Sequence, residues 1–149
     1  MLAELQATLY AEIPITQNIQ IQVMTFDEDV LTLRAPLAAN INHKGTVFAG
    51  SLNAVATLAG WGLMWLLLKR ENIAAAHIVI QDSQIRYLHP VQQDFQATCR
   101  LPDSAALQRF FTMLQRRGVA RLELATTIMA QESVAVEFSG RYVVTLHGE

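Results

Sequence analysis

Residues 39–70 read ANINHKGTVFAGSLNAVATLAGWGLMWLLLKR, and this stretch decides the fold. A turn-rich loop leads into a long apolar run, and no charged residue occurs between Lys44 and Lys69. From Leu52 to Leu68 the chain is mostly Ala, Leu, Trp, Met and Gly, without proline. A helix that is apolar on nearly every side is surrounded by other elements rather than laid on a surface. We therefore expect one central helix enclosed by the rest of the chain.

The polar residues near the start of this helix form a line. Asn53 and Thr57 are four residues apart and share one helix face, which Gly60 and Met64 continue. Such a stripe can line a functional site. Its side chains can equally bond the preceding turn of the helix or a neighbouring strand, so the spacing leaves both interpretations open.

The same helix has to be considered as a membrane span. About twenty apolar residues cross a bilayer, and Lys69 with Arg70 resembles a cytoplasmic flank. However, Asn53 and Thr57 shorten the uninterrupted apolar part, and the remaining sequence predicts strands that can wrap a helix. We expect a core helix and no membrane span.

The loop before the helix has features of a ligand-binding turn. Gly45 and Gly50 allow backbone angles that other residues avoid, and they allow a ligand to approach closely. Ser51 is suited to be the N-cap, because its hydroxyl can accept a hydrogen bond from a backbone amide that would otherwise lack a partner.

Composition limits the class of protein. The chain has 149 residues, 52% hydrophobic and 16% charged, which is enough for one domain over residues 1–149 with a substantial core. This apolar excess excludes disorder and favours an oligomer. A net charge of −2 without a basic tail argues against nucleic acid as the main partner. The single cysteine, Cys99, excludes an internal disulfide framework, and without a signal-peptide pattern we expect a cytoplasmic protein.

The flanking sequence predicts a sheet. Leucines at helical spacing predict a short helix over residues 1–11, and a second helix is expected from Asp103 or Ser104 to about Arg116, ended by Gly118. Alternation and β-branched content predict strands over 18–26, 30–35, 76–87, 95–101, 120–129 and 134–146. One antiparallel sheet curling around one helix satisfies this order, whereas a doubly wound parallel sheet needs alternating helices.

Several segments match a known family. They are Asn42-His43-Lys44-Gly45-Thr46-Val47-Phe48-Ala49-Gly50-Ser51-Leu52, Leu58-Ala59-Gly60-Trp61-Gly62, Tyr87-Leu88-His89-Pro90-Val91 and Asp94-Phe95. From about residue 18 to residue 146 the chain resembles hotdog-fold proteins. It is most similar to the bacterial thioesterase-like family that also occurs fused behind a GNAT acetyltransferase domain. The resemblance implies an α+β hotdog fold, a curved antiparallel sheet wrapped around a long central apolar helix, with subunits paired side by side as a homodimer or homotetramer.

The resemblance also implies acyl-thioester chemistry, with coenzyme A or phosphopantetheine as part of the substrate and no separate cofactor. In hotdog thioesterases of the phenylacetate-pathway type, an Asn, a Gly-Thr and a His-Gly-Gly precede the helix. An acidic residue seven positions after the last glycine activates water or attacks the thioester. Backbone amides at the helix start, here near Gly50 and Ser51, would polarise the thioester carbonyl, because the N-terminus of a helix is its positive end.

This chain matches that pattern only in part. The matching positions are Asn42, Gly45, Thr46, Gly50 and Ser51. Phe48 stands in place of the His and Ala49 in place of the first glycine, while the acid position falls on Thr57 and that of a frequent strand serine near Ile80. The general base of the better-studied thioesterases is therefore absent.

Other residues can supply part of the missing chemistry. Asp82 is the best remaining carboxylate and can act as a base, with Asn42 and Thr57 orienting a water; alternatively it is a structural residue paired with Arg86 or Arg121. His43 can act near pH 7 or be a solvated loop residue. The four histidines lack metal-ligand spacing, so we expect no metal site. Four arginines can meet the phosphates of coenzyme A or simply face solvent: Arg86, Arg100, Arg116 and Arg117.

These observations lead to two main hypotheses. In the first, the protein is a thioesterase acting on an acyl-CoA or an acyl carrier protein at a dimer-interface site. The catalytic candidates are Asn42, Thr57 and Asp82, and the substrate-binding candidates are Gly45, Thr46, Phe48, Gly50, Ser51 and Asn53. In the second, which the missing acid favours, the same fold binds or senses an acyl thioester without hydrolysing it. A structural protein without a ligand is a third reading.

Overall fold

The computed structural model describes residues 1–74 and 76–147. Within these residues, two helices, α1 (Leu2–Glu12) and α2 (Ile15–Ile19), precede the hairpin of β1 (Gln22–Asp27) and β2 (Val30–Ala35). The long helix α3 (Ala49–Arg70) follows. The remaining elements are β3 (Ala76–Tyr87), β4 (Phe95–Arg100), α4 (Ser104–Arg117), β5 (Val119–Ala130) and β6 (Ser133–Leu146).

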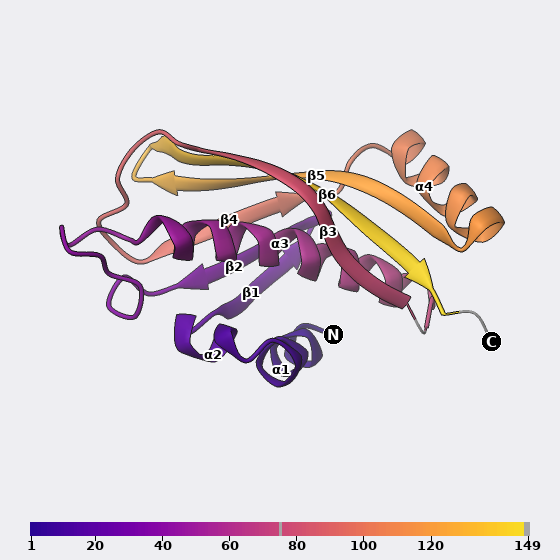
Figure 1. Ribbon diagram of the computed structural model, residues 1–149, viewed down its shortest axis with the longest axis horizontal. Helices are drawn as coiled ribbons and strands as arrows, with labels where there is room; N and C mark the ends of the chain where they lie inside the picture. The colour runs from indigo at the N-terminus through magenta and orange to yellow at the C-terminus, as the bar shows by residue number, and fades with distance from the viewer. Residues whose placement is uncertain (75, 148–149) are drawn as a thin grey trace.

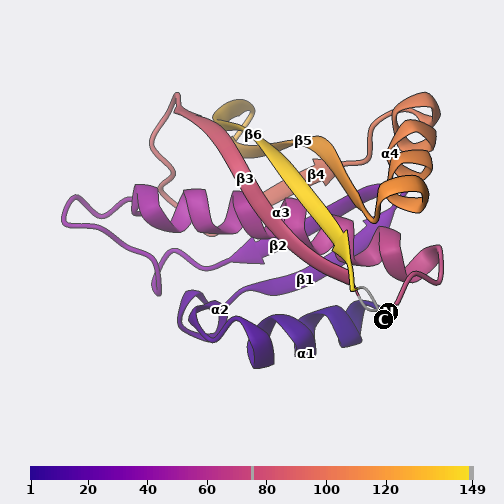
Figure 2. The ribbon, with the colours of Figure 1, turned by 45° about the vertical axis from the view of Figure 1, so that its right-hand side comes forward.

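The strands form one antiparallel sheet that encloses α3. Their order is β1-β2-β4-β5-β6-β3, so β1 and β3 are the two edges. Figure 1 shows α3 running through the concave side of the curved sheet, and Figure 2 shows β3 passing along one flank of the helix while α1 lies beside β1. This is the α+β hotdog arrangement that the sequence predicts.

The enclosure of α3 explains its composition. Residues from all around the helix are inaccessible to solvent, among them Val55, Leu63 and Leu67. By length and composition α3 would be able to cross a membrane, yet 67% of its most apolar stretch is buried inside this chain. Burial by the sheet accounts for the apolar run, as a core helix requires.

Polar bonds from the sheet also hold α3 in place. The hydroxyl of Tyr142 in β6, which is fully buried, donates to the backbone carbonyl of Thr57 over 2.7 Å. The hydroxyl of Thr126 in β5 donates to the carbonyl of Ala56 over 3.4 Å. Gly60, one turn further along, admits the tyrosine ring, since a Cβ at this position would overlap its hydroxyl and ring atoms. The glycine therefore makes room for the hydrogen bond.

Gly60→Ala should destabilise the protein by about 1–3 kcal/mol, because the added methyl group overpacks the contact with Tyr142. Tyr142→Leu should also destabilise it, but the double variant should cost less than the sum of the two, since a shorter side chain relieves the clash. Urea unfolding of the four proteins measures this coupling. Strictly additive costs would mean that the two residues do not oppose each other.

The structure corrects three details of the sequence analysis. The segment expected as a strand from residue 18 begins with α2, and β1 starts only at Gln22. The N-cap of α3 is Phe48 rather than Ser51, and no side chain caps the helix. Gly60 and Met64 lie on the same helix face as Asn53 and Thr57, as expected, but both are buried and so cannot line an open site.

The expected ends of the second long helix are confirmed. Asp103 caps α4 by accepting from the amide of Ala106, and Gly118 ends that helix with φ of 70°. In the β1–β2 hairpin, the two turn residues Glu28 and Asp29 both have positive φ, as a two-residue turn of this kind requires.

The two edge strands of the sheet, β1 and β3, differ in whether another element covers them. The side-chain amide of Gln6 in α1 donates to the carbonyl of Ile21 and accepts from the amide of Val23, so α1 covers the β1 edge. No further strand of the described chain pairs with the outer side of β3. An uncovered strand edge is a surface on which another chain can pair.

Candidate functional site

The start of α3 presents unpaired backbone donors. The amides of Ser51 and Leu52 both donate to the carbonyl of Phe48, over 3.0 and 3.1 Å. Among the described residues, the amides of Ala49 and Gly50 have no acceptor, and both residues are exposed. These two amides sit at the positive end of the helix, so they can polarise a carbonyl oxygen. The sequence analysis expected these amides near Gly50 and Ser51. In the structure the unpaired amides lie one residue earlier, at Ala49 and Gly50.

Two aromatic side chains flank these amides. The ring of Phe48, which is 56% exposed, lies against Gly50 in the space that a side chain at position 50 would occupy. From the far end of β3, the hydroxyl of Tyr87 donates to the carbonyl of Ala49 over 3.2 Å. Gly50 therefore accommodates an aromatic ring of the chain itself, and Tyr87 ties the edge strand to the start of the helix.

Asn42 organises the preceding loop. Its side-chain oxygen accepts from the amides of Lys44 and Thr46, over 2.8 and 3.1 Å, and its side-chain nitrogen donates to the hydroxyl of Thr46 over 2.8 Å. Gly45 adopts φ of 79° within this turn. Asn42, Gly45 and Thr46 thus shape the loop before α3.

Asn42→Ala should lower the free energy of unfolding by about 1–2 kcal/mol, because three partly exposed hydrogen bonds are lost. Asn42→Asp keeps both acceptor bonds to the backbone amides and should cost less. Urea unfolding distinguishes the two variants. Equal losses would show that the acceptor bonds do not hold the loop.

One flank of α3 is incompletely covered. Asn53, Thr57, Trp61 and Trp65 are half-buried and follow one another at helical spacing, whereas most residues between them are buried. The hydroxyl of Thr57 lies 3.3 Å from the side-chain oxygen of Asn53, to which it donates. The indole nitrogen of Trp61 donates to the carbonyl of Ile78 in β3 over 3.2 Å. This half-open stripe therefore runs beside the edge strand.

A β-bulge in β3 decides which residues face that stripe. Ile80 pairs with Tyr142 of β6 and Asp82 pairs with Arg141, so Gln81 is the extra residue. Tyr142 points to α3, and its neighbour Arg141 must point to the opposite face of the sheet. Asp82 lies on that outer face too, where its carboxylate is 3.7 Å from the guanidinium of Arg141.

The bulge consequently turns Ser83 towards α3. Without it, strand alternation would have placed Asp82 there, because one inserted residue exchanges the two faces of a strand. The contacts at Ile78 and Tyr87 bracket Ser83 against the segment of α3 that carries Asn53 and Thr57. The structure thus does not bring Asp82 and Thr57 together within one chain. Neither Arg86 nor Arg121 pairs with Asp82; Arg86 lies 3.9 Å from Glu137 instead.

The remaining reactive groups lie elsewhere. No cluster of three or more His, Cys, Asp or Glu side chains suits a metal ion in residues 1–74 and 76–147. His43 is exposed in the loop. Cys99 is fully buried, and this burial raises the pKa of its thiol to about 11, opposed by a hydrogen bond with Thr126. Burial likewise raises the pKa of Tyr142, so its hydroxyl stays protonated and remains a donor.

Cys99 should resist thiol reagents at pH 8 in the folded protein and react once the chain is unfolded in urea, because only the thiolate is nucleophilic. The raised pKa also means that, as the pH rises, the Cys99 thiol ionises in the unfolded chain before it ionises in the folded protein. The contribution of this thiol to the free energy of unfolding should therefore fall as the pH rises from about 8.5 towards the folded pKa of about 11. Fast labelling under native conditions would contradict the burial of this thiol.

Comparison with known proteins identifies the family. Residues 2–146 match the family described as "Putative thioesterase (yiiD_Cterm)". The chain belongs to this family. Similar solved structures include a putative thioesterase from Shewanella oneidensis, 34% identical with a TM-score of 0.87 and covering 98% of this chain and 97% of that one. Another is a protein of unknown function from Chlorobaculum tepidum TLS, 32% identical with a TM-score of 0.92 and covering 97% and 94%.

More distant solved structures share the fold. A protein from Pseudomonas aeruginosa named a probable thioesterase is 24% identical, with a TM-score of 0.80, and covers 99% of this chain and 97% of that one. At this identity the likeness concerns the fold alone. The family thus rests on the match over residues 2–146, and the hotdog fold on the sheet-enclosed helix and the similar solved structures.

Sequence reasoning missed Ser83 and Tyr87 as parts of this region. Tyr87 was among the residues that carry the family resemblance, and its hydroxyl contact explains why a tyrosine suits that position. Ser83 has no comparable signal, because its orientation depends on a bulge that the residue pattern does not reveal.

Proposed function

We propose that the protein hydrolyses an acyl thioester in the cleft where the start of α3 and its half-open stripe meet β3. The proposal is supported above all by one observation: an otherwise enclosed helix is open along a single stripe that leads to two free amides. The thioester carbonyl would lie at the amides of Ala49 and Gly50. The acyl group would lie along the stripe.

The chemistry requires polarisation and a positioned water. Water oxygen bonds to the carbonyl carbon, the carbonyl oxygen becomes an oxyanion at the two amides, and collapse breaks the carbon–sulfur bond. The carboxylic acid and the free thiol leave, the thiolate taking the proton that the water loses. Thr57 and Asn53 can hold the attacking water, with Ser83 facing them from β3.

A second copy of the chain would complete the cleft. The open stripe lies beside the uncovered edge of β3, so pairing two such edges would place the partner over it. We infer a homodimer, or a dimer of dimers, with the site at the seam. A narrow apolar slot between subunits also suits the pantetheine arm of coenzyme A or of an acyl carrier protein.

A binding protein is the second candidate, and one observation favours it. Neither α3 nor the α3-facing side of β3 carries a carboxylate, because the acid position is Thr57 and the bulge turns Asp82 outwards. On this reading the cleft holds an acyl thioester without turnover.

Hydrolysis of acyl-CoAs and acyl-pantetheines of graded chain length tests the proposal. Thr57→Val and Ser83→Ala should each lower kcat/KM by about tenfold or more, since both remove a hydroxyl that positions the attacking water. Ser139→Ala, on the outer face of β6, is the matched control. Saturable binding without turnover by the unmodified protein would support the binding protein instead.

Asp82→Asn tests directly whether the Asp82 carboxylate lies outside the cleft or reaches into it. The outward orientation predicts little change in kcat, because the carboxylate faces Arg141 across the sheet from α3. If this variant lost activity as severely as Thr57→Val, Asp82 would have to reach the cleft of a second subunit. The proposal that Asp82 takes no part in the cleft would then be wrong.

A further inference from the structure

The half-open stripe of α3 changes character along its length. Asn53 and Thr57 are polar, whereas Trp61 and Trp65, one and two turns further on, are aromatic. All four side chains are half-buried. Polar groups suit the attacking water and the thioester carbonyl, and aromatic rings suit a hydrocarbon. An acyl group bound in the proposed cleft would therefore extend from Thr57 towards Trp61.

Trp61 closes the gap between α3 and β3. Its indole nitrogen donates to the backbone carbonyl of Ile78 over 3.2 Å, so the ring spans from the helix to the strand. A ring that is half-buried and hydrogen-bonded at its polar end is held in one orientation. Both residues belong to the same chain. A second copy paired along β3 would thus cover the stripe from outside and leave this closure in place.

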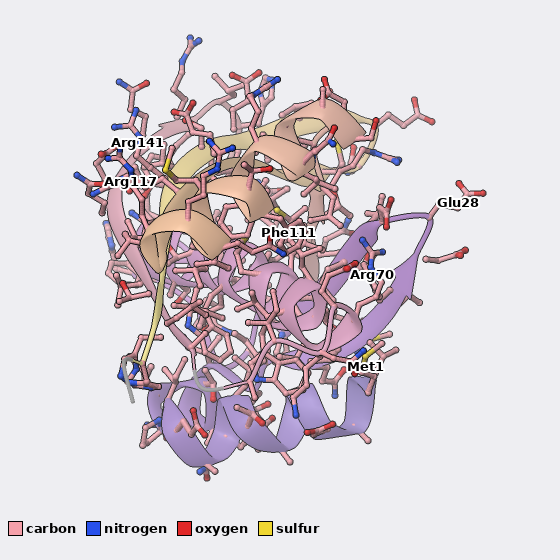
Figure 3. The ribbon with its side chains drawn as sticks, turned by 90° about the vertical axis from the view of Figure 1, so that its right-hand side faces the viewer. Met1, Glu28, Arg70, Phe111, Arg117 and Arg141 are labelled. Carbon is pink, nitrogen blue, oxygen red and sulfur yellow. The ribbon has the colours of Figure 1, made fainter. Side chains whose placement is uncertain are left out.

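A hollow lies beyond Trp61, near the end of α3. Its volume is about 230 Å³, and the apolar residues that line it include Trp65, Leu68, Ile73 and Ile78. This end of the helix, marked by Arg70, faces the viewer in Figure 3. Ile78 both accepts the hydrogen bond of Trp61 and lines the hollow. The indole of Trp61 therefore stands between Thr57 and the hollow.

The length available to the acyl group follows from the geometry of the helix. A thioester carbonyl bound at the two free amides, with the attacking water at Thr57, lies about level with Asn53. Trp61 is eight residues further along, which is about 12 Å at about 1.5 Å per residue. Contact with the indole takes up about 4 Å. The remaining length of about 8 Å holds about six carbon–carbon bonds, because an extended hydrocarbon advances about 1.25 Å per bond.

We propose that Trp61 limits the length of the acyl group, and that the protein acts on acyl thioesters of about six to eight carbons. The inference rests on the proposed hydrolysis and adds the length of its substrate. In this role Trp61 determines specificity, because it contacts the end of the acyl group and not the reacting carbonyl. Removal of the ring would join the stripe to the hollow and admit longer acyl groups.

Hydrolysis of a series of acyl-pantetheines, from acetyl to palmitoyl, measures the limit. For the unmodified protein, kcat/KM should be at least about tenfold higher with the octanoyl than with the lauroyl substrate, because the longer group meets the indole. Trp61→Ala should raise kcat/KM for the lauroyl substrate by about tenfold or more. Trp65→Ala is the matched control: it removes the same side chain one turn beyond the limit and should leave the length profile unchanged.

A graded substitution guards against an unstable variant. Trp61→Phe removes less of the ring than Trp61→Ala and should move the limit by fewer carbons. Thermal melting checks that each variant is folded. The profile of the unmodified protein tests the limit without any substitution, since undiminished turnover of the palmitoyl substrate would overturn the role of Trp61.

Binding separates the length limit from the chemistry. In calorimetry with S-alkyl pantetheine thioethers, which cannot be hydrolysed, each added methylene group should tighten binding by about fourfold until the limit is reached. No turnover of any substrate, with a limit that Trp61→Ala moves, would defeat the proposed hydrolysis and uphold the limit. Turnover without a limit, or an equal shift in Trp65→Ala, would overturn the role of Trp61 alone. Neither turnover nor binding would overturn both proposals.

Discussion

The burial of one apolar helix governs this structure. A helix without a polar face cannot remain in water, so the sheet must curve around α3 and leave few openings. Hydrogen bonds from the sheet to backbone carbonyls of the enclosed helix also fix its orientation. Tyr142 and Thr126 reach across from the sheet to carbonyls in its middle, and Gly60 is small because the tyrosine occupies the adjacent space. The register of the helix within the sheet is thereby determined by hydrogen bonds as well as by packing.

The proposed chemistry belongs where this enclosure is incomplete. At the β1 edge, α1 covers the strand with side-chain hydrogen bonds and fills the space against the core. At the β3 edge no such cover exists within the described chain, and the adjoining stripe of α3 stays half-exposed. One free edge, one open stripe and two free amides at the helix start therefore lie on a single side of the molecule. The fold itself brings them together.

The sequence predicted the architecture because its signals were strong and local. An uncharged run, the alternation of strand residues and a capped helix each predict one element without reference to the others. The errors arose where tertiary contacts override local pattern. Residues 18–21 alternate like a strand, yet Ile19 ends a short helix; Ser51 is a good capping type, yet the carbonyl of Phe48 already accepts the first amides. The role of Asn42 was uncertain because its partners within the loop cannot be read from spacing alone.

The bulge at Gln81 explains why the sequence alone could not predict which side chains of β3 face the cleft. A strand shows alternation only while its pairing is regular, and one extra residue exchanges its faces from that point onward. Asp82, the best carboxylate by composition, is thereby turned towards Arg141, whereas the unremarked Ser83 is turned towards the helix. The same inserted residue supplies the side chain that holds Arg121. One irregularity in an edge strand thus determines which of its side chains line the cleft and which lie on the outer face of the sheet.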